Sequence, residues 1–518
     1  MRRGLLGLTL VPLVASLTVA ALPPDGVRAT QEHLQKVIAA AEPSIVAAVV
    51  SHSTRYPPLP ADEQKLPGRL GGYVRRVAPQ VGRWRPIDQT PDPLDLSDPL
   101  NARDYQYGSG IVLDADGLVL TNFHLIEGAT KVYVRTGTGR GFYADIHAAD
   151  ARSDLAVLKP VDGLGRGAAL TPVKFADVRT GGEKPTVAKG MFVVALGHPA
   201  AAGIADGSAS SSWGILSNIG RRTAGPGRED QRSRALHHYN MLLQTDARVT
   251  LGCSGGALLN MDGELIGLTT PMAAVTGSET AGGFAIPFDR NYRRIVDALK
   301  AGREVEYGFL GVQAEPVLPE SVDGGHDRGG LRLTAVVPGT PAFTANLMPM
   351  DIVIAIDGLP VGEPDDLFLH IGAALAGTKL KLTVRRGSQT TPVEVTLAKL
   401  DHPLPWIASS RPKPVHGLRV DYSSVLLVQK QNAPRGAVAP RVPPGVVVRE
   451  LEPGSPAEKK FKAINDAPNQ WLITHVNNKP VPTPADFYRE AASSPTGSVS
   501  VRLVNPDDPS QERDVRLP

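Results

Sequence analysis

A serine set among glycines is the first feature of this sequence that could do chemistry. Ser254 stands in the run Gly252-Cys253-Ser254-Gly255-Gly256. Glycine reaches positive φ and has no Cβ, so the backbone can approach another group closely here. Acyl transfer on serine needs such a turn, because the hydroxyl must be exposed while N–H groups face the oxygen that gains charge. We expect the N–H groups of Gly252 and Ser254 to form this oxyanion hole, although the run alone also fits an ordinary turn.

A serine nucleophile needs a base, and the base needs a group that orients it. His124 ends the segment 108–124, which reads as two strands joined by an Asp-Ala-Asp-Gly turn, and Asp154 directly precedes an apolar strand. The order His124, Asp154, Ser254 is that of the triad in chymotrypsin-like proteases. Each residue alone has an ordinary structural role, but the three together predict a catalytic triad.

The same residues predict a mechanism and a specificity. Ser254 attacks a peptide carbonyl while His124 takes its proton, and Asp154 holds the imidazole in the required tautomer. The segments expected to form the specificity pocket, 248–251 and 269–283, carry mostly small or apolar residues, and Glu279 is the acid among them. We therefore expect a small or medium aliphatic side chain at P1.

Two sets of short strands must position these residues. One set falls at 43–50 and within 107–175, and the second lies between 191 and 286. Regular short strands with glycine-bearing turns are typical of a barrel or a sandwich, and two such sets favour two barrels. The sequence therefore predicts a mainly β fold in which the triad meets between two barrels. Apolar residues at helical spacing within 289–302 predict a closing helix, and 30–41 predicts another before the first strand.

An internal repeat follows the second set of strands. Gly330 to Ala342 recurs as Gly445 to Ala457, and Ile356 to Val361 recurs as Val476 to Val481, with a small insertion in the second copy around 463–470. Both copies resemble PDZ domains, which are α+β. We assign them to residues 303–400 and 415–518, joined by a proline-rich linker at 401–414.

PDZ domains bind peptides by strand addition and hold the C-terminal carboxylate on consecutive N–H groups. In the first copy the matching loop contains Leu310, Gly311 and Val312, and hydrophobic C-terminal peptides are the expected ligands. In the second copy the loop is taken as 417–420, where Arg419 replaces the usual glycine. We expect carboxylate binding there to be impaired. Either loop could instead be a strand start that packs on the protease.

From about residue 40 onward the sequence resembles the HtrA (Deg) family of trypsin-like serine endopeptidases. The matching blocks are 121–128, 150–159, 243–246, 252–259, 263–267 and 283–287. The resemblance implies a chymotrypsin-like double β-barrel protease domain at 31–302, unfolded or damaged proteins as substrates, and a homo-oligomer, trimeric or larger. It also implies that the long insertion 52–106 can reach a neighbouring subunit. Two departures are Cys253, where asparagine is usual, and Ala257, where proline is usual.

Composition and the N-terminus limit the remaining possibilities. A net charge of +3 gives no reason to expect nucleic acid as a partner, and the one cysteine excludes an internal disulfide. We expect Cys253 to be a small packed side chain and not a redox group. Two arginines followed by an apolar run from Leu5 to Leu22 predict a signal peptide at 1–21, hence a periplasmic or otherwise exported protein. Membrane attachment is expected only if that segment is not cleaved.

Two functions of different classes remain open. The first is an exported, ATP-independent serine endopeptidase with no metal and no cofactor, whose PDZ domains recruit exposed C-termini. The second is a proteolytically silent peptide-binding chaperone or scaffold. The complete set of triad residues favours the first, while Cys253 and Ala257 leave the second open because both could change how the oxyanion loop settles.

Overall fold

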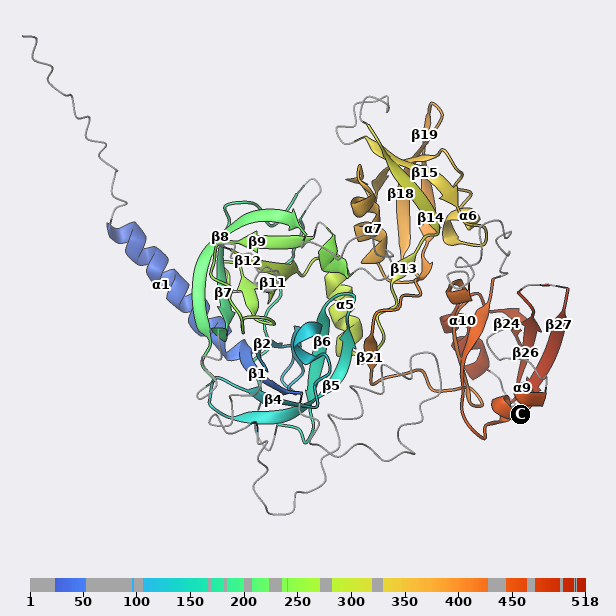
Figure 1. The fold of residues 1–518 in the computed structure, drawn as a ribbon, viewed down its shortest axis with the longest axis horizontal. Coiled ribbons are helices and arrows are strands. Elements are labelled where there is room, and N and C mark those ends of the chain that lie inside the picture. Colours follow the sequence, from blue (N-terminus) through green and yellow to red (C-terminus); the bar gives the residue numbers. More distant parts are fainter. Residues whose placement is uncertain are drawn as a thin grey trace, which may run out of the picture.

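The computed structural model describes most of the chain (Figure 1). The described residues are 24–52, 96, 106–164, 169–180, 184–199, 207–222, 235–239, 241–270, 282–318, 329–426, 444–463, 471–493, 497–506, 508 and 510–518. The predicted signal segment, Glu279 and nearly all of the insertion 52–106 lie outside these ranges.

The first barrel contains six strands. These are β1 (Ile45–Ser51), β2 (Gln106–Val112), β3 (Val119–Asn122), β4 (Lys131–Arg135), β5 (Gly141–Asp150) and β6 (Leu155–Pro160). They pair in the order β5-β4-β1-β2-β3-β6, and the pairing of β5 with β6 closes the ring. Every residue of β1 is buried, because Val46, Ala48 and Val50 face the barrel interior while Ile45 and Val49, on the other face, pack in two further apolar clusters.

The second barrel is also closed and six-stranded. Its strands are β7 (Phe192–Gly197), β8 (Ser210–Arg221), β9 (Leu242–Thr245), β10 (Ala257–Leu259), β11 (Leu265–Thr270) and β12 (Gly283–Pro287). One apolar cluster joins the barrels, with Ile45, Ile111 and Leu120 on the first and Val194 and Leu196 on the second. The predicted fold class, mainly β with two barrels, is confirmed, and the packed seam fixes how the two barrels lie against each other.

Helices flank the barrels at both ends. α5 (Arg290–Lys300) begins at Asp289, whose side chain accepts hydrogen bonds from two N–H groups of the first turn, and it buries Ile295 and Leu299 as their spacing predicted. α1 (Pro24–Ala41) starts six residues earlier than the predicted helix and leads through a 3₁₀ turn, η1 (Glu42–Ser44), into β1. Within the described ranges no helix is long and apolar enough to span a membrane.

Two sheets of the same strand order follow. The first copy has β13 (Gly308–Phe309), β14 (Val312–Val317), β15 (Gly330–Val336), α6 (Pro341–Thr344), β16 (Ile352–Ile356), β17 (Leu359–Pro360), α7 (Pro364–Gly372), β18 (Lys379–Arg386), β19 (Gln389–Thr396) and β20 (Ala398–Lys399). The second has β22 (Leu418–Tyr422), β23 (Val446–Leu451), α9 (Pro456–Ala463), β24 (Leu472–Val476), β25 (Lys479–Pro480), α10 (Pro484–Ala492), β26 (Val499–Val504) and β27 (Glu512–Leu517). The orders β14-β15-β16-β18-β19 and β22-β23-β24-β26-β27 match, as the internal repeat requires. The predicted insertion in the second copy lies almost wholly at 464–470, outside the described residues.

The segment predicted as a linker needs a correction. Residues 406–408 form β21 (Trp406–Ala408), which pairs with the outer edge of β5 in the first barrel. Ile407 enters the apolar core of that barrel. The exposed edge of β5 explains this, because its unpaired N–H and C=O groups are satisfied when another strand is added. The segment is therefore part of the first barrel's sheet as well as a connection.

The first copy also contacts the barrel region. Arg222, which follows β8, forms an ion pair of 2.8 Å with Asp365 of α7. Phe368 of the same helix lies against Tyr239, which precedes β9, with ring centroids 6.1 Å apart. α7 thus contacts the connection between β8 and β9 of the second barrel directly.

Candidate active site

The three predicted catalytic side chains meet at the seam between the barrels. Nε2 of His124 lies 3.1 Å from Oγ of Ser254, and Nδ1 of His124 lies 2.8 Å from Oδ2 of Asp154. His124 belongs to a short helix, α3 (Phe123–Ile126), and not to the end of a strand as the sequence suggested. Asp154 lies in the turn between β5 and β6, and Ser254 lies just before β10. The geometry allows a proton to pass from serine to histidine without rearrangement.

Asp154 is buried and held by several donors. Its carboxylate accepts hydrogen bonds from the backbone N–H of His124 at 2.9 Å and from Nδ2 of Asn122 at 3.1 Å, besides the histidine ring. Burial raises the pKa of this carboxyl. The charge of His124 and the hydrogen bond to it lower the pKa by more than burial raises it, so the net pKa lies below the usual value. Asp154 has φ of 58°, and the Asn122 amide also binds its carbonyl oxygen, which fixes this left-handed conformation.

The pKa of His124 shifts in the opposite direction, upward. Burial lowers its pKa, but the charge of Asp154 and the hydrogen bond to it raise the pKa above the ordinary value of 6.5. The imidazolium that forms during acyl transfer is therefore stabilised by the aspartate beneath it. Its side chain remains 42% exposed, whereas that of Asp154 is 5% exposed, so the ring is open to a substrate.

The turn before the nucleophile has the conformation that its glycines permit. Gly252 has φ of 91° and Gly255 has φ of 84°. A Cβ on Gly255 would lie 2.1 Å from the carbonyl oxygen of Ser109, so no larger residue fits there. Within the described part of the chain, neither the N–H of Gly252 nor that of Ser254 donates a hydrogen bond to the protein. Both are free to bind an oxyanion.

Ser109 of β2, which the sequence pattern does not single out, holds this turn. Its N–H donates to the carbonyl of Ser254 at 2.7 Å, and its hydroxyl donates to the carbonyl of Gly252 at 2.9 Å. The same hydroxyl accepts the N–H of His198 at 2.9 Å. The Gly-Ser-Gly pattern at 108–110 was the only local signal, and a serine in a strand rarely stands out. Asn122 beside Asp154 was missed for the same reason.

Cys253 packs behind the nucleophile. It is 7% exposed, and burial raises the pKa of its thiol, so the thiolate that redox chemistry needs is disfavoured. Its carbonyl accepts the hydroxyl of Thr269 at 2.5 Å and the N–H of Gly256 at 2.9 Å. In the described ranges no group of three or more His, Cys, Asp or Glu residues could hold a metal ion.

The loop of the first PDZ copy presents free amides. Gly311 has φ of 85°, and the carbonyls of Leu310 and Gly311 accept N–H groups of Ala342 and Val337 at 3.0 and 2.9 Å. Because C=O and N–H point in opposite directions across a trans peptide, the N–H groups of Gly311 and Val312 face away from these partners. Consecutive N–H groups aimed at one place suit a carboxylate.

In the second copy, the structure changes which residue corresponds to Gly311. The residue equivalent to Gly311 is Gly417, with φ of 91°, because its carbonyl accepts the N–H of Glu452 as that of Gly311 accepts the N–H of Val337. Arg419 is therefore not a substitute for the glycine. It lies two positions further along β22 and pairs with Glu450 and Glu452 at 3.3 Å each.

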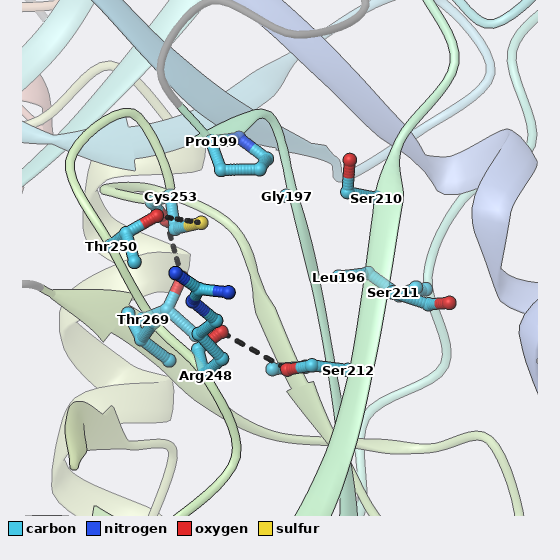
Figure 2. Close-up of a pocket in the computed structure, with 12 residues that line it drawn as sticks. Leu196, Gly197, Pro199, Ser210, Ser211, Ser212, Arg248, Thr250, Cys253 and Thr269 are labelled. Carbon is cyan, nitrogen blue, oxygen red and sulfur yellow. Dashed lines mark hydrogen bonds between the residues drawn. The ribbon is translucent and has the colours of Figure 1, made fainter. Parts of the chain in front are cut away.

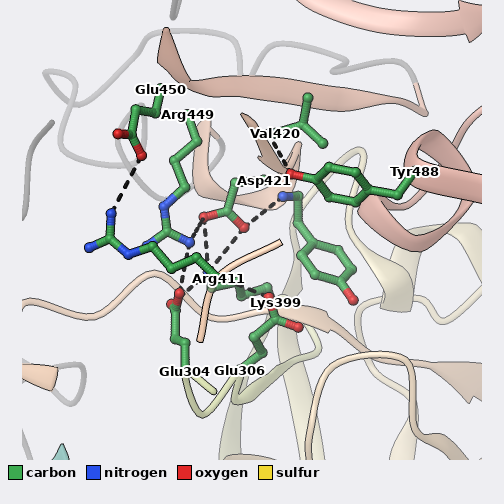
Figure 3. A network of polar contacts seen from close by, with 10 residues as sticks. Glu304, Glu306, Lys399, Arg411, Val420, Asp421, Arg449, Glu450 and Tyr488 are labelled. Carbon is green, nitrogen blue, oxygen red and sulfur yellow. Dashed lines mark hydrogen bonds and ion pairs between the residues drawn. The ribbon is translucent and has the colours of Figure 1, made fainter. Parts of the chain in front are cut away.

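Other contacts close this second loop. The N–H groups of Leu418, Val420 and Tyr422 on edge strand β22 all donate within the chain. Their acceptors are the carbonyl of Val415 at 2.8 Å, the hydroxyl of Tyr488 at 3.3 Å and Oδ1 of Asp421 at 2.8 Å. Figure 3 shows the Tyr488 ring from α10 reaching the backbone of Val420. Strand addition by a peptide would have to displace these bonds.

Family models and known proteins match most of this architecture. The model of the trypsin-like peptidase domain matches residues 108–268, and that of the PDZ domain matches residues 308–397. A putative serine protease, HhoA of Synechocystis sp., is 31% identical over 306 residues, which cover 57% of this chain and 71% of the relative. A probable periplasmic serine endoprotease, DegP-like, of Hahella chejuensis is 28% identical over 417 residues, covering 78% of this chain and 79% of the relative. Among solved structures, the HtrA-type protease AlgW with a decapeptide matches at 23% identity and a TM-score of 0.46, covering 71% of this chain and 99% of that one.

Proposed function

The chain belongs to the HtrA family of trypsin-like serine endopeptidases, and we propose that it cleaves peptide bonds through the triad His124, Asp154 and Ser254. The observation that carries this proposal is the continuous contact from Oγ of Ser254 to Nε2 of His124 at 3.1 Å and from Nδ1 to Asp154 at 2.8 Å. A nucleophile, a base and an orienting carboxylate in contact are the parts that this chemistry needs.

The parts act in sequence on a bound peptide. Oγ of Ser254 attacks the scissile carbonyl while Nε2 of His124 accepts its proton, and the ring later gives that proton to the leaving amine. Asp154 stabilises the imidazolium during both steps, which agrees with the raised pKa of the histidine. The N–H groups of Gly252 and Ser254 bind the oxyanion, a contribution of about 3 to 4 kcal/mol per donor in a comparable enzyme.

The first PDZ copy recruits the substrate or an activating peptide. Hydrophobic C-termini add a strand to β14, and their carboxylate binds the N–H groups of the loop formed by Leu310, Gly311 and Val312. The free amides of this loop support the assignment. The second copy, whose edge is already bonded, does not share this role.

Substrates and location follow from the family. Relatives described as periplasmic serine endoproteases support an exported protein, in agreement with the predicted signal peptide. The substrates are unfolded or damaged proteins, because an open cleft with a peptide-recruiting domain accepts extended chains. The assembly is a homo-oligomer.

Unfolded casein tests the proposal against the silent scaffold. The wild-type chain is expected to release fragments, and Ser254→Ala is expected to release none while it keeps the same thermal midpoint. Equal and negligible turnover by both proteins would overturn the protease and favour the scaffold.

A fluorophosphonate probe gives a second readout that does not depend on the substrate. It should label the wild-type chain at Ser254, found by peptide mapping, and label His124→Ala much more slowly, because the serine then lacks its base. Labelling at another serine would contradict the triad.

A further inference from the structure

A pocket of about 440 Å³ lies beside the oxyanion turn (Figure 2). One wall comes from the end of β7, with Leu196 and Gly197, and from the first residues of β8. The opposite wall is the segment 248–250 together with Cys253, the residue directly before the nucleophile. The pocket therefore borders the turn that carries Ser254, and its other walls belong to the second barrel.

The lining mixes hydroxyl groups with apolar surface and carries one charged group. Five of the lining residues have hydroxyls, namely Ser210, Ser211, Ser212, Thr250 and Thr269. The charged residue is Arg248, and none of the twelve lining residues is acidic. Figure 2 shows its guanidinium among the lining residues on the side of Cys253, and the residue as a whole is exposed to solvent.

Within the described part of the chain the guanidinium of Arg248 has no hydrogen-bond or ion-pair partner. Only its backbone carbonyl is engaged, by the hydroxyl of Ser212 at 3.0 Å. The acid nearest in sequence, Asp246, is turned away and accepts the N–H of Ile215 at 2.6 Å. An unpaired guanidinium in a pocket of hydroxyls suits a carboxylate, which it can bind by two parallel charge-assisted hydrogen bonds.

The position of this residue in the chain is informative too. In trypsin, the aspartate that selects a basic P1 side chain stands six residues before the nucleophilic serine. Arg248 stands six residues before Ser254 and has the opposite charge. We infer that Arg248 is a specificity determinant and that this protease selects an acidic residue, aspartate or glutamate, at P1.

This inference replaces the aliphatic P1 expected from the sequence. That expectation rested on the small and apolar residues of 248–251 and 269–283 and gave no weight to Arg248, whose side chain the fold brings into the pocket. The inference rests on the proposed function, since an acidic P1 has meaning only if the triad cleaves peptides.

Matched peptide substrates test it on the full-length enzyme. Substrates that differ only at P1, with Glu, Gln, Ala or Lys, are compared by kcat/KM after the active sites are counted with the fluorophosphonate. The wild type should favour Glu over Gln by about tenfold or more, the ratio expected for one charge-assisted hydrogen-bonded pair. Arg248→Gln should bring the ratio of Glu to Gln close to one, and Arg248→Glu should make Lys the preferred residue.

Two further variants keep the test interpretable. Arg248→Lys retains a charge and should keep part of the preference, which a merely structural role would not predict. Arg221→Gln removes a cation from the far end of β8, where its side chain binds Gln244, and should leave the Glu to Gln ratio unchanged. Equal thermal midpoints exclude misfolding.

Failure of this inference and failure of the proposed function give different experimental results. Labelling and cleavage with no preference for Glu, or a preference that survives Arg248→Gln, would overturn this inference alone. Selection of acid at a position other than P1 in a positional peptide library would overturn it as well. Absence of labelling at Ser254 would remove the proposed function and the inference with it.

Discussion

Ser254, the proposed nucleophile, is held in place by a residue of the other barrel. Ser109 binds the carbonyls of Ser254 and Gly252 through its N–H and its hydroxyl, so the oxyanion turn is fastened to the first barrel at two points. The orientation of the Gly252 carbonyl sets the direction of nearby amides. Ser109 thus acts on the chemistry through the turn and is a positioning residue.

The substitution Ser109→Ala should lower kcat by about tenfold with little change in KM. It removes the hydroxyl that fixes the Gly252 carbonyl, and the loss should stay below that of a direct oxyanion donor, about 100-fold or more. Steady-state kinetics and the rate of fluorophosphonate labelling measure it. Thr130→Ala is the matched control, because it removes a buried hydroxyl that binds the carbonyl of Ser51 in the same barrel. An equal loss of kcat in both variants would contradict a positioning role.

A second prediction at this scale concerns the proton affinity of His124. In Ser254→Ala the ring should titrate above 6.5, since Asp154 raises its pKa more than burial lowers it. Adding Asp154→Asn removes that charge, and burial then dominates, so the ring should titrate below 6.5. NMR of the ring protons measures both values. With a raised pKa, general-base activity falls as pH decreases through that value, because the ring becomes protonated.

An unchanged pKa in the double variant would show that Asp154 does not control the histidine. The wild-type acid limb of kcat/KM should agree with the value measured for the free enzyme.

At the scale of elements, the equivalent edge strands of the two PDZ copies differ in the hydrogen bonding of their N–H groups. β14 and β22 occupy the same place in their sheets, but β22 has three N–H groups bonded to its own chain. The hydroxyl that binds Val420 belongs to Tyr488 of α10. The equivalent residue of α7 is Phe368, which has no hydroxyl and packs against Tyr239 of the protease. Tyr488 is therefore one of three groups that close the edge of β22, and α7 has no counterpart to its hydroxyl.

Peptide binding should consequently depend on one glycine and not on its counterpart. In the Ser254→Ala background, Gly311→Ala should weaken binding of a hydrophobic C-terminal peptide by about tenfold or more, because φ of 85° is strained for alanine and the Cβ would lie 2.3 Å from Thr340. Fluorescence anisotropy with a labelled peptide measures this.

Gly417→Ala is the matched control, since it creates the same strain in the second copy, with a Cβ 2.1 Å from Ser455. It should leave the affinity unchanged, and an amidated peptide should not bind. Loss of binding in Gly417→Ala would place the peptide in the second copy and refute the assignment.

At the scale of the whole molecule, a buried ionic cluster joins three parts of the chain (Figure 3). Lys399, at the end of the first copy, binds Glu304 at 2.7 Å and Asp421 of the second copy at 2.9 Å. Arg449 binds the same two carboxylates at 2.7 and 3.3 Å. Burial raises the pKa of Glu304, but the charges of Lys399 and Arg449 lower it below its usual value. Each charge in the cluster has an opposite partner.

Lys399→Met should destabilise this junction by about 3 to 5 kcal/mol, the range for removing one partner of a buried pair. Two carboxylates would then share one cation in a poorly solvated site. Denaturation followed by intrinsic fluorescence measures the change.

Lys379→Met is the control, because Lys379 pairs with Glu394 at 3.0 Å on the surface, where both side chains are more than half exposed. It should cost at most about 1 kcal/mol. Equal effects of the two substitutions would show that the junction is no more than a surface contact. Because the folded pKa of Glu304 is depressed, its stabilisation of the wild type is present at neutral pH and is lost as pH falls through that value.

Much of this protein could be predicted from the sequence because the relevant signals are local. A serine among glycines, a histidine after a strand and an aspartate before one point to the proposed triad residues, and strand and turn patterns recur at distances of a few residues. The internal repeat likewise lies within the sequence itself. The fold class and the family membership follow from such signals and are confirmed.

Only the tertiary structure decided which groups meet across long separations. Ser109 reaches a turn 143 residues away, β21 pairs with β5, and Gly417 replaces Arg419 as the counterpart of Gly311. The direction of the Arg248 side chain, on which the inferred acidic P1 preference depends, likewise follows from the tertiary structure. The physical reason is that these contacts depend on how barrels and sheets pack against each other, and packing joins residues whose local sequence carries no record of their partners.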